Sequence, residues 1–111
     1  MQRTAILALL ALLPVLTAAA CGGGASQTDR DRAVIEAGQA FREAKLTSAE
    51  LRRGPCIAEQ LPGLPDWVVD IAHSPREPVD EVPANQCQRF RTGQAHHFVE
   101  LDPAGHLIRA Q

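Results

Sequence analysis

The stretch "HHFVELDPAGHLIRA", His96–Ala110, decides the fold because it has the form of a strand, a tight turn and a second strand. Its central "DPAG" suits a type I turn that is followed by a bulged glycine. This turn predicts a register in which Leu101 lies opposite Leu107 and Asp102 lies opposite His106. We therefore expect a β-hairpin at the carboxyl terminus.

A third strand is expected further back along the chain, since two strands alone are marginally stable. The segment "WVVDIAH", Trp67–His73, alternates so that Trp67, Val69 and Ile71 share one face. Trp67, the single tryptophan, is interpreted as a core residue rather than as a platform for a ligand.

A helix is expected from Asp29 to about Lys45, where apolar residues recur at the spacing of one helix face. Thr28 is the predicted N-cap. "TSAE", residues 47–50, has the form of a capping box and predicts a short second helix. The sequence thus predicts a small single α+β domain over residues 29–111, in which an N-terminal amphipathic helix packs on a small antiparallel sheet that ends in the C-terminal hairpin.

The remaining segments are interpreted as loops and one helical turn. "LPGLPD" at 61–66 and "SPREPVDEVPAN" at 74–85 are rich in turn residues. A helical turn is expected from about Ala84 to Thr92, closed by Gly93, which would place Cys87 and Phe90 on one side. The 74–85 loop either presents a proline-stiffened binding surface or merely spans the distance between two elements.

The first 20 residues have the layout of a secretory signal peptide. Arg3 supplies a positive charge, "AILALLALL" follows at 5–13, and small residues lead to Cys21. This apolar run is too short for a membrane-spanning helix, which needs about 20 apolar residues. Simple secretion after Ala20, with Cys21 left free, is the alternative to lipidation.

The segment Ala18–Cys21 resembles the lipobox of bacterial lipoproteins, although Ala18 stands where leucine is usual. The resemblance implies a diacylglyceryl group on the Cys21 sulfur, cleavage before Cys21, and acylation of the new amine. One acyl chain binds membranes marginally and two suffice, so this anchor would be durable. Residues 21–28 then form the lipidated cysteine and a flexible tether. Gly22, where such proteins carry aspartate for inner-membrane retention, implies the periplasmic face of the outer membrane.

The three cysteines can be assigned if Cys21 carries lipid, because Cys56 and Cys87 then have only each other. An oxidising periplasm permits a disulfide between them. Two buried free thiols are the alternative. A catalytic pair is less favoured, since the C-x-x-C spacing is missing from the sequence.

The four histidines offer a weak candidate for a metal site. Zinc would need His73, one of His96 or His97, and His106 to converge with a carboxylate such as Asp102. Adjacent residues of a strand point to opposite faces, so His96 and His97 cannot both ligate one ion. Surface or capping roles are the favoured interpretation, and the sequence implies no cofactor.

Composition and spacing favour a binding protein over an enzyme. The chain has 111 residues, a net charge of -2 and scattered basic residues, which do not suggest a nucleic-acid partner. Paired carboxylates of a glycosidase would have to come from acidic residues that we interpret as solvated surface: Glu59, Asp66, Asp70, Glu77, Asp80, Glu81 and Glu100. The expected function is that of a lipid-anchored envelope protein, non-enzymatic, which binds or stabilises another periplasmic or outer-membrane component. A periplasmic metal-binding module is the alternative, and the oligomeric state is left open.

Overall fold

The computed structural model describes Pro14 and residues 24–111 of the chain. The predicted signal peptide, apart from Pro14, and the predicted lipidation site Cys21 lie outside the described residues. The elements follow one another as α1 (Gln27–Ala44), α2 (Ser48–Leu51), β1 (Cys56–Ala58), β2 (Trp67–Ile71), the 3-10 helices η1 (Pro78–Glu81) and η2 (Pro83–Asn85), α3 (Gln88–Arg91), β3 (His97–Leu101) and β4 (Leu107–Ala110). No helix among these elements is long and apolar enough to cross a bilayer.

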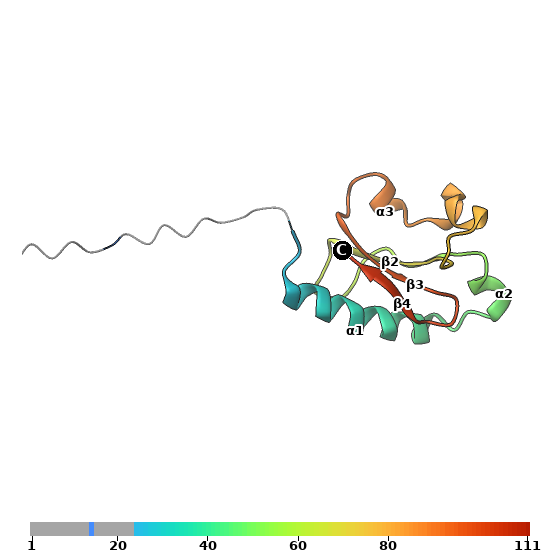
Figure 1. Ribbon diagram of the computed structural model, residues 1–111, viewed down its shortest axis with the longest axis horizontal. Coiled ribbons are helices and arrows are strands. Elements are labelled where there is room, and N and C mark those ends of the chain that lie inside the picture. The colour runs from blue at the N-terminus through green and yellow to red at the C-terminus, as the bar shows by residue number, and fades with distance from the viewer. Residues whose placement is uncertain (1–13, 15–23) are drawn as a thin grey trace, which may run out of the picture.

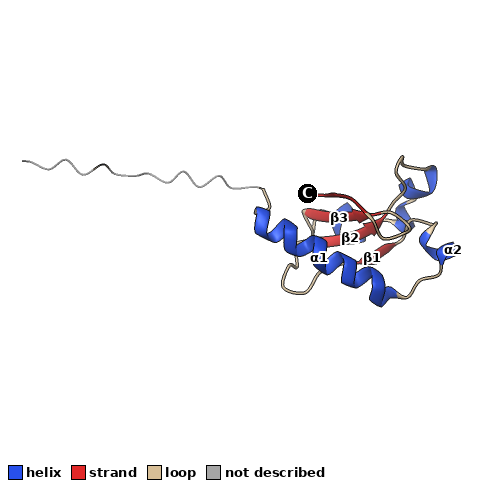
Figure 2. Cartoon of the chain, turned by 60° about the horizontal axis from the view of Figure 1, so that its bottom comes forward, coloured by secondary structure: helices blue, strands red, loops and turns tan. Residues whose placement is uncertain are grey.

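The fold is α+β, with α1 packed along one face of a four-stranded sheet, as the sequence predicts. Figure 1 shows α1 beneath the sheet and α3 on its other side, and Figure 2 shows α1 crossing the strands. The helix occupies residues 27–44, so it lies after the predicted signal peptide and takes in the last two residues, 27 and 28, of the predicted flexible tether. Its N-cap is Ser26, whose side chain accepts the Asp29 N–H, and not the predicted Thr28.

The sheet is mixed, so the expected antiparallel sheet is wrong at one pair of strands. The order is β1-β2-β3-β4, and β2 and β3 run parallel while the outer pairs are antiparallel. Alternation of side chains shows which residues share a face but not which way a strand runs. Parallel neighbours need a crossover of a dozen or more residues, and residues 72–96 supply it. The strand β1 was not predicted, because its three residues follow Pro55 with no alternating pattern.

The C-terminal hairpin is confirmed. Leu101 pairs with Leu107, and the Asp102 N–H donates to the His106 carbonyl at 2.8 Å. The Gly105 N–H donates to the Asp102 carbonyl, and Gly105 has a φ of 89°. A Cβ at Gly105 would lie 2.8 Å from the ring of Phe41, so the turn packs directly against α1.

The main core lies between α1 and the sheet. Trp67, Val69 and Ile71 of β2 face α1 and are at most 2% exposed, which confirms their predicted common face. Small residues on the helix, Ala33 and Ala37, let it lie close to the strands. A second, smaller core on the opposite face joins Val68 to Cys87 and Ala95. Since β2 is covered on both faces, it carries few polar residues, as strands of this kind do.

The Cys56–Cys87 disulfide is present and confirms the predicted pairing. It joins the edge strand β1 to the residue that precedes α3. The bond therefore fixes α3 against the sheet face opposite α1.

Candidate functional site

The sheet face opposite α1 carries a hollow of about 500 Å³, which we call the sheet hollow. Its floor consists of Val68 and Asp70 from β2, Phe98 and Glu100 from β3, and Arg109 from β4. These residues lie side by side because the parallel register pairs residue 68 with 98 and residue 70 with 100. Successive side chains of a strand point to opposite faces of the sheet, so the residues of β2 and β3 that do not face α1 point into the hollow.

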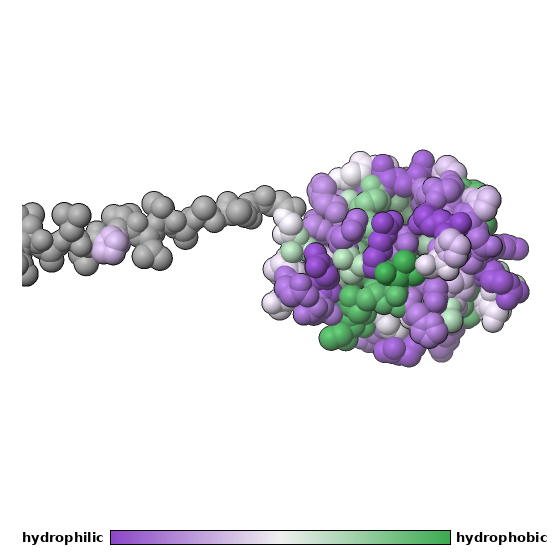
Figure 3. Space-filling model, in the orientation of Figure 1, coloured by the Kyte–Doolittle hydropathy of each residue, from purple (hydrophilic) through white to green (hydrophobic). Residues whose placement is uncertain are grey.

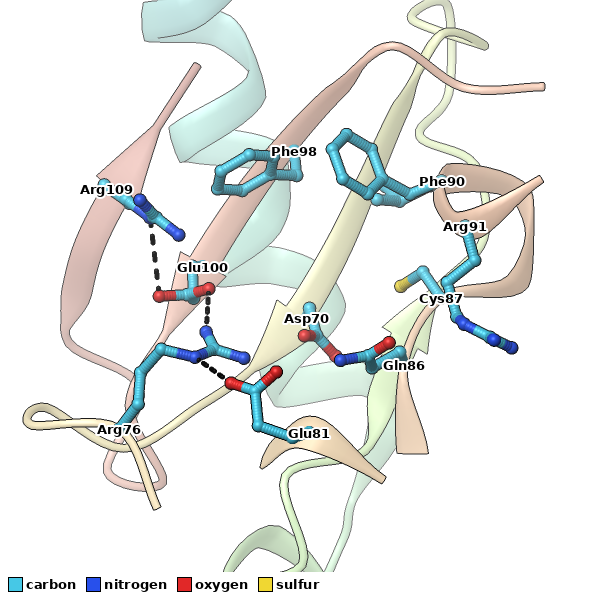
Figure 4. Close-up of a pocket in the computed structure, with 11 residues that line it drawn as sticks. Asp70, Arg76, Glu81, Gln86, Cys87, Phe90, Arg91, Phe98, Glu100 and Arg109 are labelled. Carbon is cyan, nitrogen blue, oxygen red and sulfur yellow. Dashed lines mark hydrogen bonds and ion pairs between the residues drawn. The ribbon is translucent and has the colours of Figure 1, made fainter. Parts of the chain in front are cut away.

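The walls of the sheet hollow come from the crossover between β2 and β3. One wall is formed by Arg76, Glu81 and Gln86, and the other by α3 with Phe90 and Arg91 (Figure 4). The loop expected at 74–85 thus contributes to a site, and it is more ordered than expected, since it contains η1 and η2. Cys87 lies between the two walls and attaches α3 to β1 through the disulfide.

Asp80 organises the first wall, although the sequence suggested a solvated surface residue. It is 1% exposed, and its carboxylate accepts the backbone N–H groups of His73 and Glu77 at 2.9 Å each. Burial alone would raise the pKa of Asp80, but these hydrogen bonds, together with one from the His73 ring, lower it. Its backbone carbonyl accepts the Gln86 amide at 3.0 Å, which closes the loop.

The charges of the sheet hollow are unequally paired. Arg76 donates to Glu81 at 2.6 Å and to Glu100 at 2.9 Å, and so joins the wall to the floor (Figure 4). Glu100 is 5% exposed and has a second, longer contact of 3.6 Å with Arg109. Buried charges are tolerated where they are paired in this way.

Asp70 has no such partner. Its Oδ1 is buried and has no hydrogen-bond partner among the described residues. Burial, followed by the negative charge of Glu100, raises the pKa of Asp70 to about 8. A pKa of about 8 keeps most Asp70 side chains protonated at pH 7, and the protonated acid can donate as well as accept a hydrogen bond.

The upper end of the sheet hollow is aromatic. Phe90 and Phe98 meet edge to face, with ring centroids 5.2 Å apart, and the Arg109 guanidinium lies 5.0 Å from the centroid of Phe98. Phe90 is 42% exposed. In the view of Figure 3, which follows Figure 1, other apolar residues gather over α1 and β4. Two of the exposed large apolar residues, Ile35 and Leu107, belong to α1 and β4 and do not line the hollow.

The structure does not bring the candidate metal ligands together. His73 contacts Asp80 and Glu77 near the end of β2, where it shares a shallow depression with Asp102. His106 contacts Asp102 at 3.2 Å across the hairpin turn, as expected for a local pair.

His96 and His97 lie at the other end of β3, where both contact Asp66. Four residue steps of strand, roughly 13 Å, separate His97 from the end of β3 that leads to Asp102. His97 also stacks on Trp67, with ring centroids 4.9 Å apart. Hydrogen bonds from His96 outweigh the opposing effect of burial and lower the pKa of Asp66.

Among the described residues, the acidic and sulfur or imidazole groups close enough to hold a metal are Cys56, Glu59 and Cys87. The two cysteines are oxidised to a disulfide, and Glu59 accepts the N–H groups of Gln88 and Arg89 at the start of α3. The disulfide and Glu59 therefore have a structural role, since they hold the start of α3 in place.

Three acidic residues of the sheet hollow, Asp70, Glu81 and Glu100, were interpreted from the sequence as solvated surface, and the hollow itself was not predicted, but a signal exists. β2 reads "WVVDI" and β3 reads "HFVEL", with the acidic residue at the fourth position of both. Both acidic residues alternate with the apolar residues that face the expected helix. This pattern indicates two neighbouring carboxyls on the sheet face that the helix does not cover. No family model, curated protein or solved structure matches the chain.

Proposed function

We propose that this chain is a lipid-anchored protein of the bacterial envelope, whose domain binds another envelope component through the sheet hollow and catalyses no reaction. The observation that carries the proposal is the combination, at one hollow, of the exposed Phe90 with arginines at its rim. Aromatic residues and arginine are the types enriched at protein interfaces and their hot spots. The proposed location is the periplasmic face of the outer membrane, with attachment through Cys21.

The short connection between the proposed anchor and the domain supports this function. Six residue steps separate Cys21 from Gln27, where α1 begins, and an extended chain of that length spans about 20 Å. A lipid on Cys21 would keep the hollow close to the bilayer, where envelope partners are concentrated. Tethering of this kind raises the effective concentration of a partner on the same membrane.

Metabolic labelling with palmitate tests the anchor. The wild-type chain is expected to incorporate label and to fractionate with membranes, whereas Cys21→Ala should be unlabelled because the acceptor sulfur is gone. A wild-type protein that carries no label and is recovered in the soluble periplasmic fraction would refute the anchor.

Site-specific photo-crosslinking in living cells tests the binding face. A photoreactive residue at position 90 is expected to give a discrete adduct with a partner. The control is the same residue at position 35, because Ile35 is an apolar residue on the helix side of the molecule that is more accessible than Phe90, 73% exposed against 42%. Equal adducts at both positions, or none at position 90, would contradict the proposed binding face.

A further inference from the structure

We infer that the sheet hollow accepts a carboxylate that a partner polypeptide carries next to a large apolar side chain, as at a C-terminal aromatic residue. This inference rests on the proposed binding function and adds the chemical class of the bound group. It follows from which charges of the hollow are already paired, from the aromatic end of the hollow, and from the unpartnered Asp70.

The three acidic side chains of the hollow are not available to attract a cation. Glu81 and Glu100 both accept hydrogen bonds from Arg76, whose third nitrogen, Nη2, donates to the Asp80 carbonyl at 3.3 Å. Arg76 offsets one of the two negative charges, and Arg109, 3.6 Å from Glu100, offsets the other. Asp70 at pH 7 is mostly neutral. The negative charge of the hollow is thus compensated from within.

One positive charge, that of Arg91, is left uncompensated in the hollow. Arg91 lines the hollow from α3 and forms no ion pair with any described residue. Arg109 makes only the 3.6 Å contact with Glu100 through Nε, and half of its side chain is exposed. Guanidinium groups bind carboxylates with two parallel hydrogen bonds, so these two arginines favour a carboxylate ligand.

Asp70 is suited to the same ligand. A buried polar atom without a partner costs free energy, and a ligand that hydrogen-bonds to it recovers that cost. As a neutral acid, Asp70 donates its O–H to an anionic oxygen. A cationic ligand would instead have to ionise Asp70 beside Glu100, which the surroundings oppose.

The aromatic end of the hollow supplies the apolar part of the site. Phe90 and Phe98 form an angled pair, and Val68 and the disulfide lie beneath them. The volume of about 500 Å³ is within the range of ligand pockets, about 300–1,000 Å³. It can hold one aromatic residue with its terminal carboxylate.

A matched pair of probes tests the inference on the full-length processed protein in lipid nanodiscs. The first probe is a fluorescently labelled Gly/Ser peptide that ends in phenylalanine with a free carboxylate, and the second is the same peptide with a C-terminal amide. Both contain the same ring, and only the first has the charge. We expect the acid to bind at least about tenfold more tightly, because a charge-assisted hydrogen bond contributes about 1.5–3 kcal/mol.

Three variants locate the binding. Arg91→Gln should weaken binding of the acid about tenfold and leave the amide unchanged. Arg42→Gln is its control, since Arg42 lies in the last turn of α1, on the other face of the sheet, and should change neither affinity. Asp70→Val removes the O–H donor and should weaken binding of the acid about tenfold. Thermal unfolding of each variant verifies that it is folded.

The results separate the two proposals. Equal binding of acid and amide, an affinity for the acid in Asp70→Val equal to that of wild type, or no binding of either probe would overturn the inference about the ligand. Each of these results leaves the proposed function standing if position 90 still gives its adduct. Absence of that adduct contradicts the binding function itself, whatever the peptides do.

Discussion

At the scale of single residues, Asp70 and Glu100 show how the same chemical group acquires two states from its neighbours. They lie side by side on β2 and β3. Glu100 has Arg76 at 2.9 Å and Arg109 at 3.6 Å, while Asp70 has no partner for its buried Oδ1 among the described residues. Burial first, and then the negative charge of Glu100, raise the pKa of Asp70, and together they outweigh the opposing charge of Arg76.

The first prediction concerns the pH dependence that Asp70 imposes on stability. Its pKa is about 8 in the folded chain and about 3.9 when unfolded. Between these values the folded chain holds a proton that the unfolded chain has lost. The free energy of unfolding therefore falls as pH rises, by up to about 1.4 kcal/mol per unit, and the loss is complete above about pH 8.

The substitution Asp70→Asn removes this titrating group. The free energy of unfolding of the variant, relative to that of the wild type, should therefore increase as the pH is raised from 5 to 8. Urea denaturation at both pH values measures the difference. The groups that face Asp70 are present in both proteins: Glu100 from β3, Arg109 from β4, Arg76, Asp80 and Glu81 from the crossover, and Arg91 from α3. A difference that does not change with pH would show that Asp70 is ionised throughout.

At the scale of elements, N-cap residues determine where the helices begin, and the sequence predicts one of these caps but not the other. The capping box at Thr47 is confirmed, because the Thr47 side chain accepts the Glu50 N–H and the Glu50 carboxylate accepts the Thr47 N–H. For α1 the sequence offers several cap residues in a row. Ala25 packs against the core, which extends the helix toward the N-terminus and makes Ser26 the cap.

The second prediction compares the two possible caps of α1. Ser26→Ala should lower the free energy of unfolding by about 1 kcal/mol, because the Asp29 N–H loses its acceptor at 3.0 Å. Thr28→Ala is the matched control and should change stability little or raise it slightly, since alanine favours the helix interior. Chemical denaturation of both variants measures the effect. A larger loss for Thr28→Ala would mean that the helix starts later.

At the scale of the whole molecule, one disulfide connects the sheet to the crossover layer on which the proposed site depends. The layer formed by α1 is held by the main core, with Trp67, Val69 and Ile71 against the helix. The layer formed by the crossover has only a small core of Val68, Cys87 and Ala95. Small cores contribute little stability, so the link from Cys87 to β1 matters more for this layer.

The third prediction concerns this bond. The double substitution Cys56→Ser and Cys87→Ser should destabilise the domain by roughly 3–4 kcal/mol, the range for a closed loop of this length. It should also weaken binding of the acid peptide, because α3 carries Phe90 and Arg91. Reduction of the wild type should lower its melting temperature to that of the double variant, and the double variant should not respond to reductant. A response by the double variant would point to another thiol.

Local patterns determined much of the fold. The turn chemistry around Asp102 and Gly105, the alternation in β2 and the periodicity of α1 act over a few residues, and each was identified from those residues. The Cys56–Cys87 pairing was also identified, because no other pairing remains once Cys21 is assigned to lipid.

Tertiary structure alone decided the direction of β2 against β3 and the contents of the sheet hollow. Strand direction depends on the path of the crossover at 72–96, whose own residues have no regular pattern. The burial of Asp80 and Glu100 depends on what packs over them, and their partners are up to 24 residues away, as for Arg76 and Glu100. A sequence specifies near neighbours directly, but it specifies charge pairing across a sheet only through the register that folding creates.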